Sequence, residues 1–111
     1  MKVVVAFPDL INDLVPLLTG VETALVEELV SAEVARVTYD KTAGAAYIYA
    51  RPSRELNIVE KSIIGTRHGR TIELNGAYWS ALDIDNFGRI AGIEILAPGD
   101  LEPTLSEFAA V

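Results

Sequence analysis

The strongest constraint on the fold is a succession of short β-type segments after residue 33, with turn residues and no helical pattern between them. Parallel strands need a crossover of about a dozen residues or more, and the separators here are shorter than that. The segments therefore predict hairpins and an antiparallel sheet. The expected strands are VARVTYD (34–40), AAYIYAR (45–51), LNIVEKSII (56–64), RTIEL (70–74), AYWSALDID (77–85) and IAGIEIL (90–96).

The first 33 residues follow a different pattern. KVVVAF (2–7) predicts a buried strand, and residues 9–18 then show apolar residues at helical spacing. Pro16 lies inside this run and should either kink the helix or confine it to one side. Thr19 and Glu22 have the spacing of a capping box, which predicts a second helix starting at Thr19. The apolar stripe of this second helix consists of Val21, Leu25, Leu29 and Ala32.

These patterns predict one α+β domain. We expect an antiparallel sheet of five to seven short strands, with the N-terminal helical segment packed on one face. The parts are an N-terminal extension with a strand and helices (1–33), a β-rich core (34–96) and a tail (97–111). The tail predicts a loop and a short C-terminal helix capped at Thr104 or Ser106.

Charge and hydrophobic content indicate which partners to expect. The net charge is −7, and residues 1–33 hold six acidic groups against one lysine. Such a surface repels phosphate backbones, which disfavours nucleic acid, but it is compatible with a basic partner protein. Half of the residues are hydrophobic, more than a 111-residue domain readily buries. We therefore expect a homo-oligomer, with a dimer favoured.

The residue inventory also excludes several chemistries. No cysteine is present, which excludes disulfides, thiol catalysis and thiolate metal sites. No apolar run approaches the length of a membrane span, and the opening run is too short for a signal peptide, so we expect a cytoplasmic protein. The only histidine, His68, lies in a turn among basic residues without an evident orienting partner. We find no catalytic motif and expect neither enzymatic activity nor a cofactor.

Two groups of side chains each allow two interpretations. The basic residues around the central turns could bind an anion or acidic helices of another copy, although a solvated strand pair is the simpler interpretation. The aromatic residues could stack nucleic-acid bases, but the negative charge favours core packing. The basic set is Arg51, Arg54, Lys61, Arg67, His68 and Arg70, and the aromatic set is Tyr39, Tyr47, Tyr49, Tyr78 and Trp79.

The segment DIDNFGRIAGIE (83–94) nearly matches a calcium-binding loop. Asp83, Asp85, Gly88 and Glu94 occupy the first, third, sixth and twelfth places, and only Phe87 at the fifth place breaks the pattern. The flanking segments are β-type, whereas a calcium-binding loop of this kind lies between helices. We interpret the segment as a hairpin.

In this hairpin we place Glu94 opposite roughly Ser80, about 10 Å along the strand from Asp83, which is too far for a shared ion. A looser cation site formed by Asp83, Asp85 and Asn86 remains as an alternative at the turn. With it remains the hypothesis of a small metal-assisted hydrolase or ligand-binding protein.

The same hairpin carries a family resemblance. VTYDKTAGAAYIYA (37–50) and LDIDNFGRIAGIEIL (82–96) resemble the small prokaryotic domain of unknown function DUF2283, over about residues 34–96. The family often has an acidic residue before its Leu-Tyr-Ile strand, where this chain has Gly-Ala-Ala (44–46). The matching positions are Tyr39, Asp40, Lys41, Tyr47, Ile48, Asp83, Asp85, Gly88, Arg89, Gly92, Ile93, Glu94, Ile95 and Leu96.

The resemblance implies a small α+β or mostly β fold and no particular chemistry. Some members of the family look like neighbours of small toxin-like proteins. An antitoxin-like role for this chain follows only by that analogy. From these observations we expect a non-enzymatic protein-interaction module. It would self-associate or bind a basic partner through its acidic helices.

Overall fold

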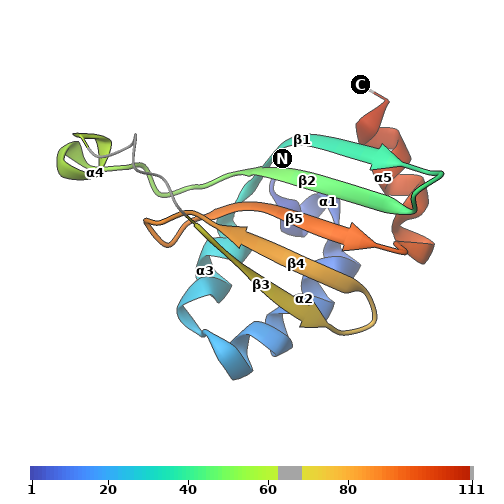
Figure 1. Cartoon of the computed structure of the whole chain (residues 1–111), viewed down its shortest axis with the longest axis horizontal. Coiled ribbons are helices and arrows are strands. Elements are labelled where there is room, and N and C mark those ends of the chain that lie inside the picture. Colours follow the sequence, from blue (N-terminus) through green and yellow to red (C-terminus); the bar gives the residue numbers. More distant parts are fainter. Residues whose placement is uncertain (63–68, 111) are drawn as a thin grey trace.

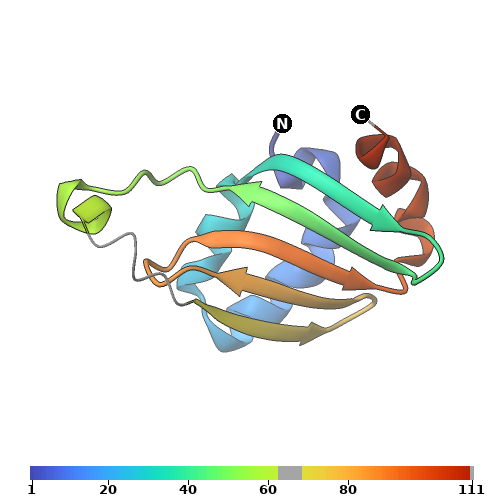
Figure 2. The ribbon, with the colours of Figure 1, turned by 45° about the horizontal axis from the view of Figure 1, so that its top comes forward.

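The computed structural model describes residues 1–62 and 69–110. Within them the chain forms an antiparallel sheet of five strands in the order β1-β2-β5-β4-β3. Helices cover one face of this sheet, and the other face carries no helix (Figures 1 and 2). The predicted α+β architecture is therefore confirmed. The strands are β1 (Glu33–Asp40), β2 (Ala45–Arg51), β3 (Arg70–Asn75), β4 (Trp79–Ile84) and β5 (Ile90–Leu96).

Five α-helices occur in the described part of the chain. Three of them come before the sheet, one lies between β2 and β3, and one closes the chain. A short 3-10 turn, η2 (Gly99–Leu101), leads into the last helix. The helices are α1 (Val3–Ala6), α2 (Pro8–Val21), α3 (Ala24–Ser31), α4 (Ile58–Ser62) and α5 (Glu102–Ala109).

The prediction of a buried strand at residues 2–7 is wrong, because this segment forms α1. Val3 and Phe7 are one helical turn apart, and both are fully buried against the core. Only Lys2 keeps a strand-like contact, an isolated bridge to Glu33. Packing of one helical face thus overrides the β preference of the valines.

Pro16 neither ends nor shortens the first long helix, since α2 continues from Pro8 to Val21. Proline removes one helical hydrogen bond and leaves the carbonyl of residue 12 without its partner. Asn12 and Pro16 are both exposed, so water can satisfy that carbonyl. The buried side of α2 consists of Leu10, Ile11, Leu14 and Leu18.

The predicted capping box at Thr19 is also wrong. Thr19 lies inside α2 and donates its hydroxyl to the carbonyl of Val15 at 2.9 Å, and the next helix begins at Ala24. Glu22 instead forms a two-pronged ion pair with Arg70 of β3. The favourable contact of Glu22 is therefore with the sheet, which sequence spacing does not reveal.

The segment predicted as a strand at residues 56–64 contains α4 instead, and residues 63–64 lie outside the described part. Asn57 accepts a hydrogen bond from the Glu60 amide at 2.9 Å, while Glu60 accepts one from the Asn57 amide at 3.1 Å. This reciprocal cap outweighs the β preference of Ile58 and Val59. Figures 1 and 2 show α4 standing away from the sheet.

The C-terminal helix is confirmed, but its start is not where it was predicted. α5 begins at Glu102, and Pro103 occupies its first turn, where the missing amide hydrogen has no helical partner in any case. Thr104 and Ser106 therefore lie inside the helix. Phe108 of α5 packs against Phe7 with ring centroids 5.3 Å apart.

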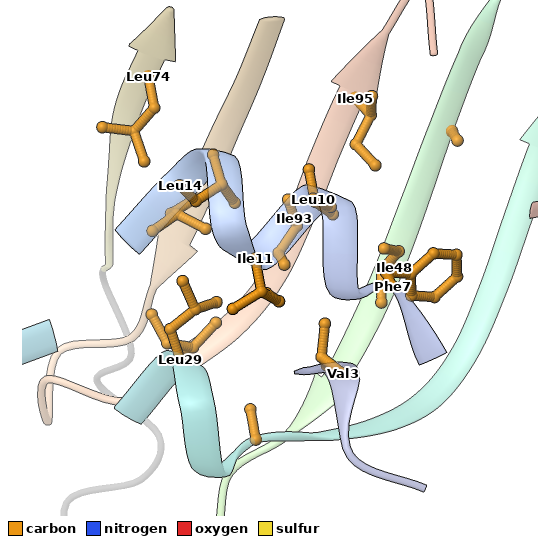
Figure 3. Packing of buried hydrophobic residues seen from close by; sticks show 14 of the residues in the cluster. Val3, Phe7, Leu10, Ile11, Leu14, Leu29, Ile48, Leu74, Ile93 and Ile95 are labelled. Carbon is orange, nitrogen blue, oxygen red and sulfur yellow. The ribbon is translucent and has the colours of Figure 1, made fainter. Parts of the chain in front are cut away.

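The hydrophobic core lies between the inner face of the sheet and the helices (Figure 3). Burying one such side chain contributes about 1.5–3 kcal/mol. Ser80 is the polar exception in this layer, because its side chain is fully buried and its hydroxyl has no hydrogen-bond partner among the described residues. The labelled core residues in Figure 3 are Val3, Phe7, Leu10, Ile11, Leu14, Leu29, Ile48, Leu74, Ile93 and Ile95. None of the helices in the described segments is both long and apolar enough to cross a bilayer.

Candidate functional site

The face of the sheet that no described helix covers, here called the uncovered face, is defined by strand alternation. On β2, Ala46 and Ile48 are buried in the core, so Tyr47 and Tyr49 point to the other side. The strand register then places fifteen residues on this face in three rows across the sheet. They are Arg36, Tyr49, Gly92, Asp83 and Thr71; Thr38, Tyr47, Glu94, Ala81 and Glu73; and Asp40, Ala45, Leu96, Trp79 and Asn75.

A hydrogen-bonded network joins residues of β2, β4 and β3 on the uncovered face and passes over β5. Tyr47 donates its phenol to one carboxylate oxygen of Asp83 at 2.6 Å, and Thr71 donates its hydroxyl to the other at 2.7 Å. The Tyr47 ring reaches Asp83 by lying directly over Gly92, where an added Cβ would stand 2.2 Å from the phenol oxygen. Gly92 is therefore required for this close approach.

The network also determines the protonation state of Tyr47. Burial raises the pKa of the Tyr47 phenol, and the hydrogen bond to the Asp83 carboxylate and its negative charge raise it further. Tyr47 is thus a stable donor and not a source of phenolate. The contact holds Tyr47 and Asp83 in place, which is a positioning role without nucleophilic chemistry.

Aromatic and cationic groups continue this arrangement toward the β1 edge. The rings of Tyr47 and Tyr49 lie 4.5 Å apart between centroids, and the Arg36 guanidinium lies 4.5 Å from the centre of the Tyr49 ring. A guanidinium at this distance is attracted by the ring quadrupole. Arg36, Tyr49 and Tyr47 therefore form an ordered stack on this side of the face.

Apolar groups occupy the middle and the far end of the face. Ala81 is only 4% exposed although no described element covers it, because its larger neighbours enclose it. Leu96 is 39% exposed and Tyr49 is 40% exposed, and Trp79, which pairs with Leu96 in register, is half-buried. The uncovered face thus combines exposed apolar surface with charged side chains.

The turn between β4 and β5 has the hairpin form that we predicted for residues 83–94. Asp85 accepts hydrogen bonds from the amides of Phe87 and Arg89, each at 2.9 Å, and its second oxygen pairs with the Arg89 side chain at 2.8 Å. Gly88 adopts a φ of +79°, a conformation that glycine allows without strain. Both Asp85 oxygens are therefore used by the turn.

Asp83, Asp85 and Asn86 do not all line one hollow, since Asp85 shares one with Asp83 and another with Asn86. The Asp83 carboxylate lies on the uncovered face, the Asp85 carboxylate holds the turn, and Asn86 is exposed. Among the described residues, no three His, Cys, Asp or Glu side chains are grouped so that they could hold a metal ion. Two shallow hollows of about 460 and 300 Å³ flank this turn, and both are lined in part by Arg70 and Asp85.

The register of the hairpin differs from our prediction by one residue. Glu94 pairs with Ala81, not with Ser80. A shift of one residue exchanges the two faces of a strand. Ser80 consequently lies in the core, and Glu94 lies half-buried on the uncovered face.

The remaining positions of the family motif lie near the β1–β2 hairpin. Asp40 accepts a hydrogen bond from the Ala43 amide at 3.0 Å and so stabilises the turn. Tyr39 packs against the core, where burial and the neighbouring Glu102 raise its pKa. These two motif residues have structural contacts in the described chain.

The basic residues highlighted by the sequence are dispersed. Arg54 binds Glu60 and the Phe87 carbonyl, and Arg70 binds Glu22. Lys61 is exposed on α4, and Arg51 is exposed on β2. Arg67 and His68 lie outside the described residues, so the prediction for His68 stays a prediction.

The aromatic residues divide between the two sides of the sheet. Tyr39 and Tyr78 pack against the core, as the core interpretation expected. That interpretation is wrong for Tyr47, Tyr49 and Trp79, which lie on the uncovered face. The carboxylates of Asp83 and Glu94 near Tyr47 repel a nucleic-acid backbone, which argues against base stacking.

Sequence reasoning missed Arg36, Thr71, Ala81 and Leu96 as members of this face. Strand alternation was the available signal, since each lies two positions along its own strand from another residue of this face. The partners across the sheet depend on the order β1-β2-β5-β4-β3, which joins segments far apart in the chain. No family model, curated protein or solved structure matches the chain, so the resemblance to DUF2283 stays a prediction.

Proposed function

We propose that this chain is a non-enzymatic protein-interaction module that self-associates through the uncovered face of its sheet. The observation that supports the proposal is the apolar surface of exposed Tyr49 and Leu96 and half-buried Trp79, on a face that no described helix covers. A sheet with apolar groups on both faces is stabilised when the second face is also covered. A second copy supplies an identical apolar surface for this purpose.

Order within the face also supports binding. Asp83 is held by Tyr47 and Thr71, and Arg36 is stacked on Tyr49, before any partner arrives. Side chains that are already ordered lose less conformational entropy when they enter an interface. The face is therefore suited to association with a modest entropic cost.

The area of the face indicates the strength of the association. Five strands about 4.8 Å apart and about six residues long cover roughly 480 Å² per copy. Stable interfaces usually bury about 800 Å² per partner, and weak or transient ones bury less. We therefore expect a reversible dimer with a Kd in the micromolar range.

No described contact favours the alternative of a metal-assisted hydrolase or ligand-binding protein. Both oxygens of Asp85 are engaged by the turn, and Asp83 serves the network on the face. The acidic helices also give less support to a basic partner than their composition suggests. Of their acidic groups, Asp13 binds the β3–β4 turn and Glu22 binds Arg70.

Sedimentation velocity between about 1 and 200 µM tests the proposal, because a micromolar dimer dissociates within this range. The diagnostic variant is Leu96→Glu, which places a charge on the exposed apolar part of the face. The matched control is Val5→Glu on α1, where the native side chain is 63% exposed on the helical side. We expect dimers for the native chain and for Val5→Glu, and monomers for Leu96→Glu. A native monomer throughout, or a dimer unaffected by Leu96→Glu, would contradict the proposal.

A further inference from the structure

The charges of the uncovered face are unevenly distributed. Arg36 of β1 is the only basic residue among the fifteen, and Arg51 of β2 lies beyond them at the end of the strand, paired in register with Glu33. The other three strands contribute only acidic charges to this face, which are Glu94 of β5, Asp83 of β4 and Glu73 of β3. One side of the face is thus able to attract the opposite side of a second copy.

Acidic residues at the two ends of β1 reduce this asymmetry of charge but do not remove it. Glu33 pairs in register with Arg51 at one end, and Asp40 stabilises the β1–β2 turn at the other. Arg36 lies between them and forms no salt bridge with any residue in the described chain; its contact is with the Tyr49 ring. Its guanidinium donors are therefore available to a carboxylate from outside.

Glu73 is the best-placed acceptor for such a contact. Its side chain is exposed, and no described basic group forms a salt bridge with it. Asp83 is one strand further in, but its carboxylate already accepts hydrogen bonds from Tyr47 and Thr71. A second copy therefore meets an unneutralised carboxylate at Glu73 first.

A two-fold dimer formed through this face can have its axis in either of two directions. An axis across the strands through the middle row stacks each strand on its own copy, which places Glu73 on Glu73 and Glu94 on Glu94, and Arg36 opposite Asp40. An axis parallel to the strands instead stacks β1 on β3 and β2 on β4 of the other copy, so that Arg36 faces Thr71 and lies one row, about 7 Å along the strand, from Glu73. Facing sheets lie about 10 Å apart, a gap that an arginine and a glutamate can span together.

On the basis of the proposed function, we infer that the axis is parallel to the strands and that Arg36 of each copy pairs with Glu73 of the other. Opposite charges then approach each other at both side edges of the interface. The other axis instead brings the Glu73 carboxylates together and leaves Arg36 opposite Asp40, whose carboxylate already stabilises the β1–β2 turn. The two pairs are related by the two-fold axis, so each dimer contains the contact twice. This pairing determines the orientation of the copies more than it determines their affinity.

Charge reversal tests this orientation in solution. Arg36→Glu makes both pairs acidic and Glu73→Arg makes both pairs basic, so each variant alone should dissociate about tenfold more readily than the native dimer. The double variant Arg36→Glu/Glu73→Arg should regain the native affinity. An equimolar mixture of the two single variants should form a mixed dimer with native-like affinity, because both of its pairs are again complementary.

Glu27→Arg on the exposed surface of α3 changes the net charge as Glu73→Arg does and serves as the control. It should leave the native affinity unchanged, and circular dichroism should show every variant folded. Loss of affinity in both single variants without recovery in the mixture would overturn the pairing, as would single variants that dimerise normally. Either result leaves the proposed function standing if Leu96→Glu still abolishes the dimer, whereas a monomeric native chain removes both.

Discussion

The packing of Tyr47 over Gly92 can be tested by the substitution Gly92→Ala. This change should lower the free energy of unfolding when the Tyr47 ring is present and raise it when the ring is absent. An alanine at this position would place its Cβ 2.2–2.4 Å from atoms of the Tyr47 ring, so the ring would have to move away. Moving it breaks the hydrogen bond from Tyr47 to Asp83. The backbone at Gly92 is not in the left-handed region, so alanine is tolerated there once the ring is absent.

The magnitude follows from two opposing effects. A charge-assisted hydrogen bond contributes about 1.5–3 kcal/mol, and alanine is favoured over glycine within a strand by about 0.5–1 kcal/mol. Gly92→Ala should therefore lower the free energy of unfolding by about 1 kcal/mol in the native background. In a Tyr47→Ala background the same change should raise it by about 0.5–1 kcal/mol.

Urea denaturation followed by circular dichroism measures both effects. With a slope of about 2 kcal/mol per molar urea, the native background should show a midpoint lowered by about 0.5 M. All four proteins of the cycle are compared at one low concentration, since dimerisation adds to apparent stability. An equal effect of Gly92→Ala in both backgrounds would refute the packing of Tyr47 over Gly92.

Three further predictions concern other sites. Ser80→Ala removes a buried hydroxyl without a partner and should raise the free energy of unfolding by about 1 kcal/mol, measured by the same denaturation; a loss of stability would contradict the absence of a partner. The hydrogen bond to Asp100 is the main cause that raises the pKa of Tyr78 to about 12. The pKa of Tyr78 is higher in the folded than in the unfolded chain, so this stabilisation is complete below about pH 10 and is lost as pH rises through about 12. Tyr78→Phe should therefore reduce the change in the free energy of unfolding between about pH 10 and 12. Glu94→Gln removes a like charge near the centre of the self-association face and should lower the dimer Kd about threefold, whereas binding of a basic partner there would be weakened by the same change.

The sheet could be predicted from sequence because its signals are local. β2 and β5 have the predicted bounds, and residues 83–94 form the predicted hairpin. Where the local signals conflict, tertiary packing or capping decides. The valines of α1 favour a strand but pack as a helix through Val3 and Phe7, and Asn57 caps a helix in a segment of β-branched residues.

The candidate site was only partly accessible to sequence reasoning. The sequence predicted the hairpin that carries Asp83, but it favoured core packing for Tyr47 and Tyr49, which lie on the uncovered face. The contact between Tyr47 and Asp83 joins residues 36 positions apart across an intervening strand. It depends on strand order and on a glycine beneath the ring, and neither follows from local spacing.

The most direct test of self-association through this face uses Trp79, the only tryptophan in the chain. Trp79 lies on the uncovered face beside Leu96, so its fluorescence reports whether that face is covered. On dilution from about 200 to 1 µM, we predict a red shift of the Trp79 emission that coincides with the decrease in mass from dimer to monomer. A decrease in mass with unchanged emission would place the interface elsewhere and contradict the account, and so would a constant monomeric mass.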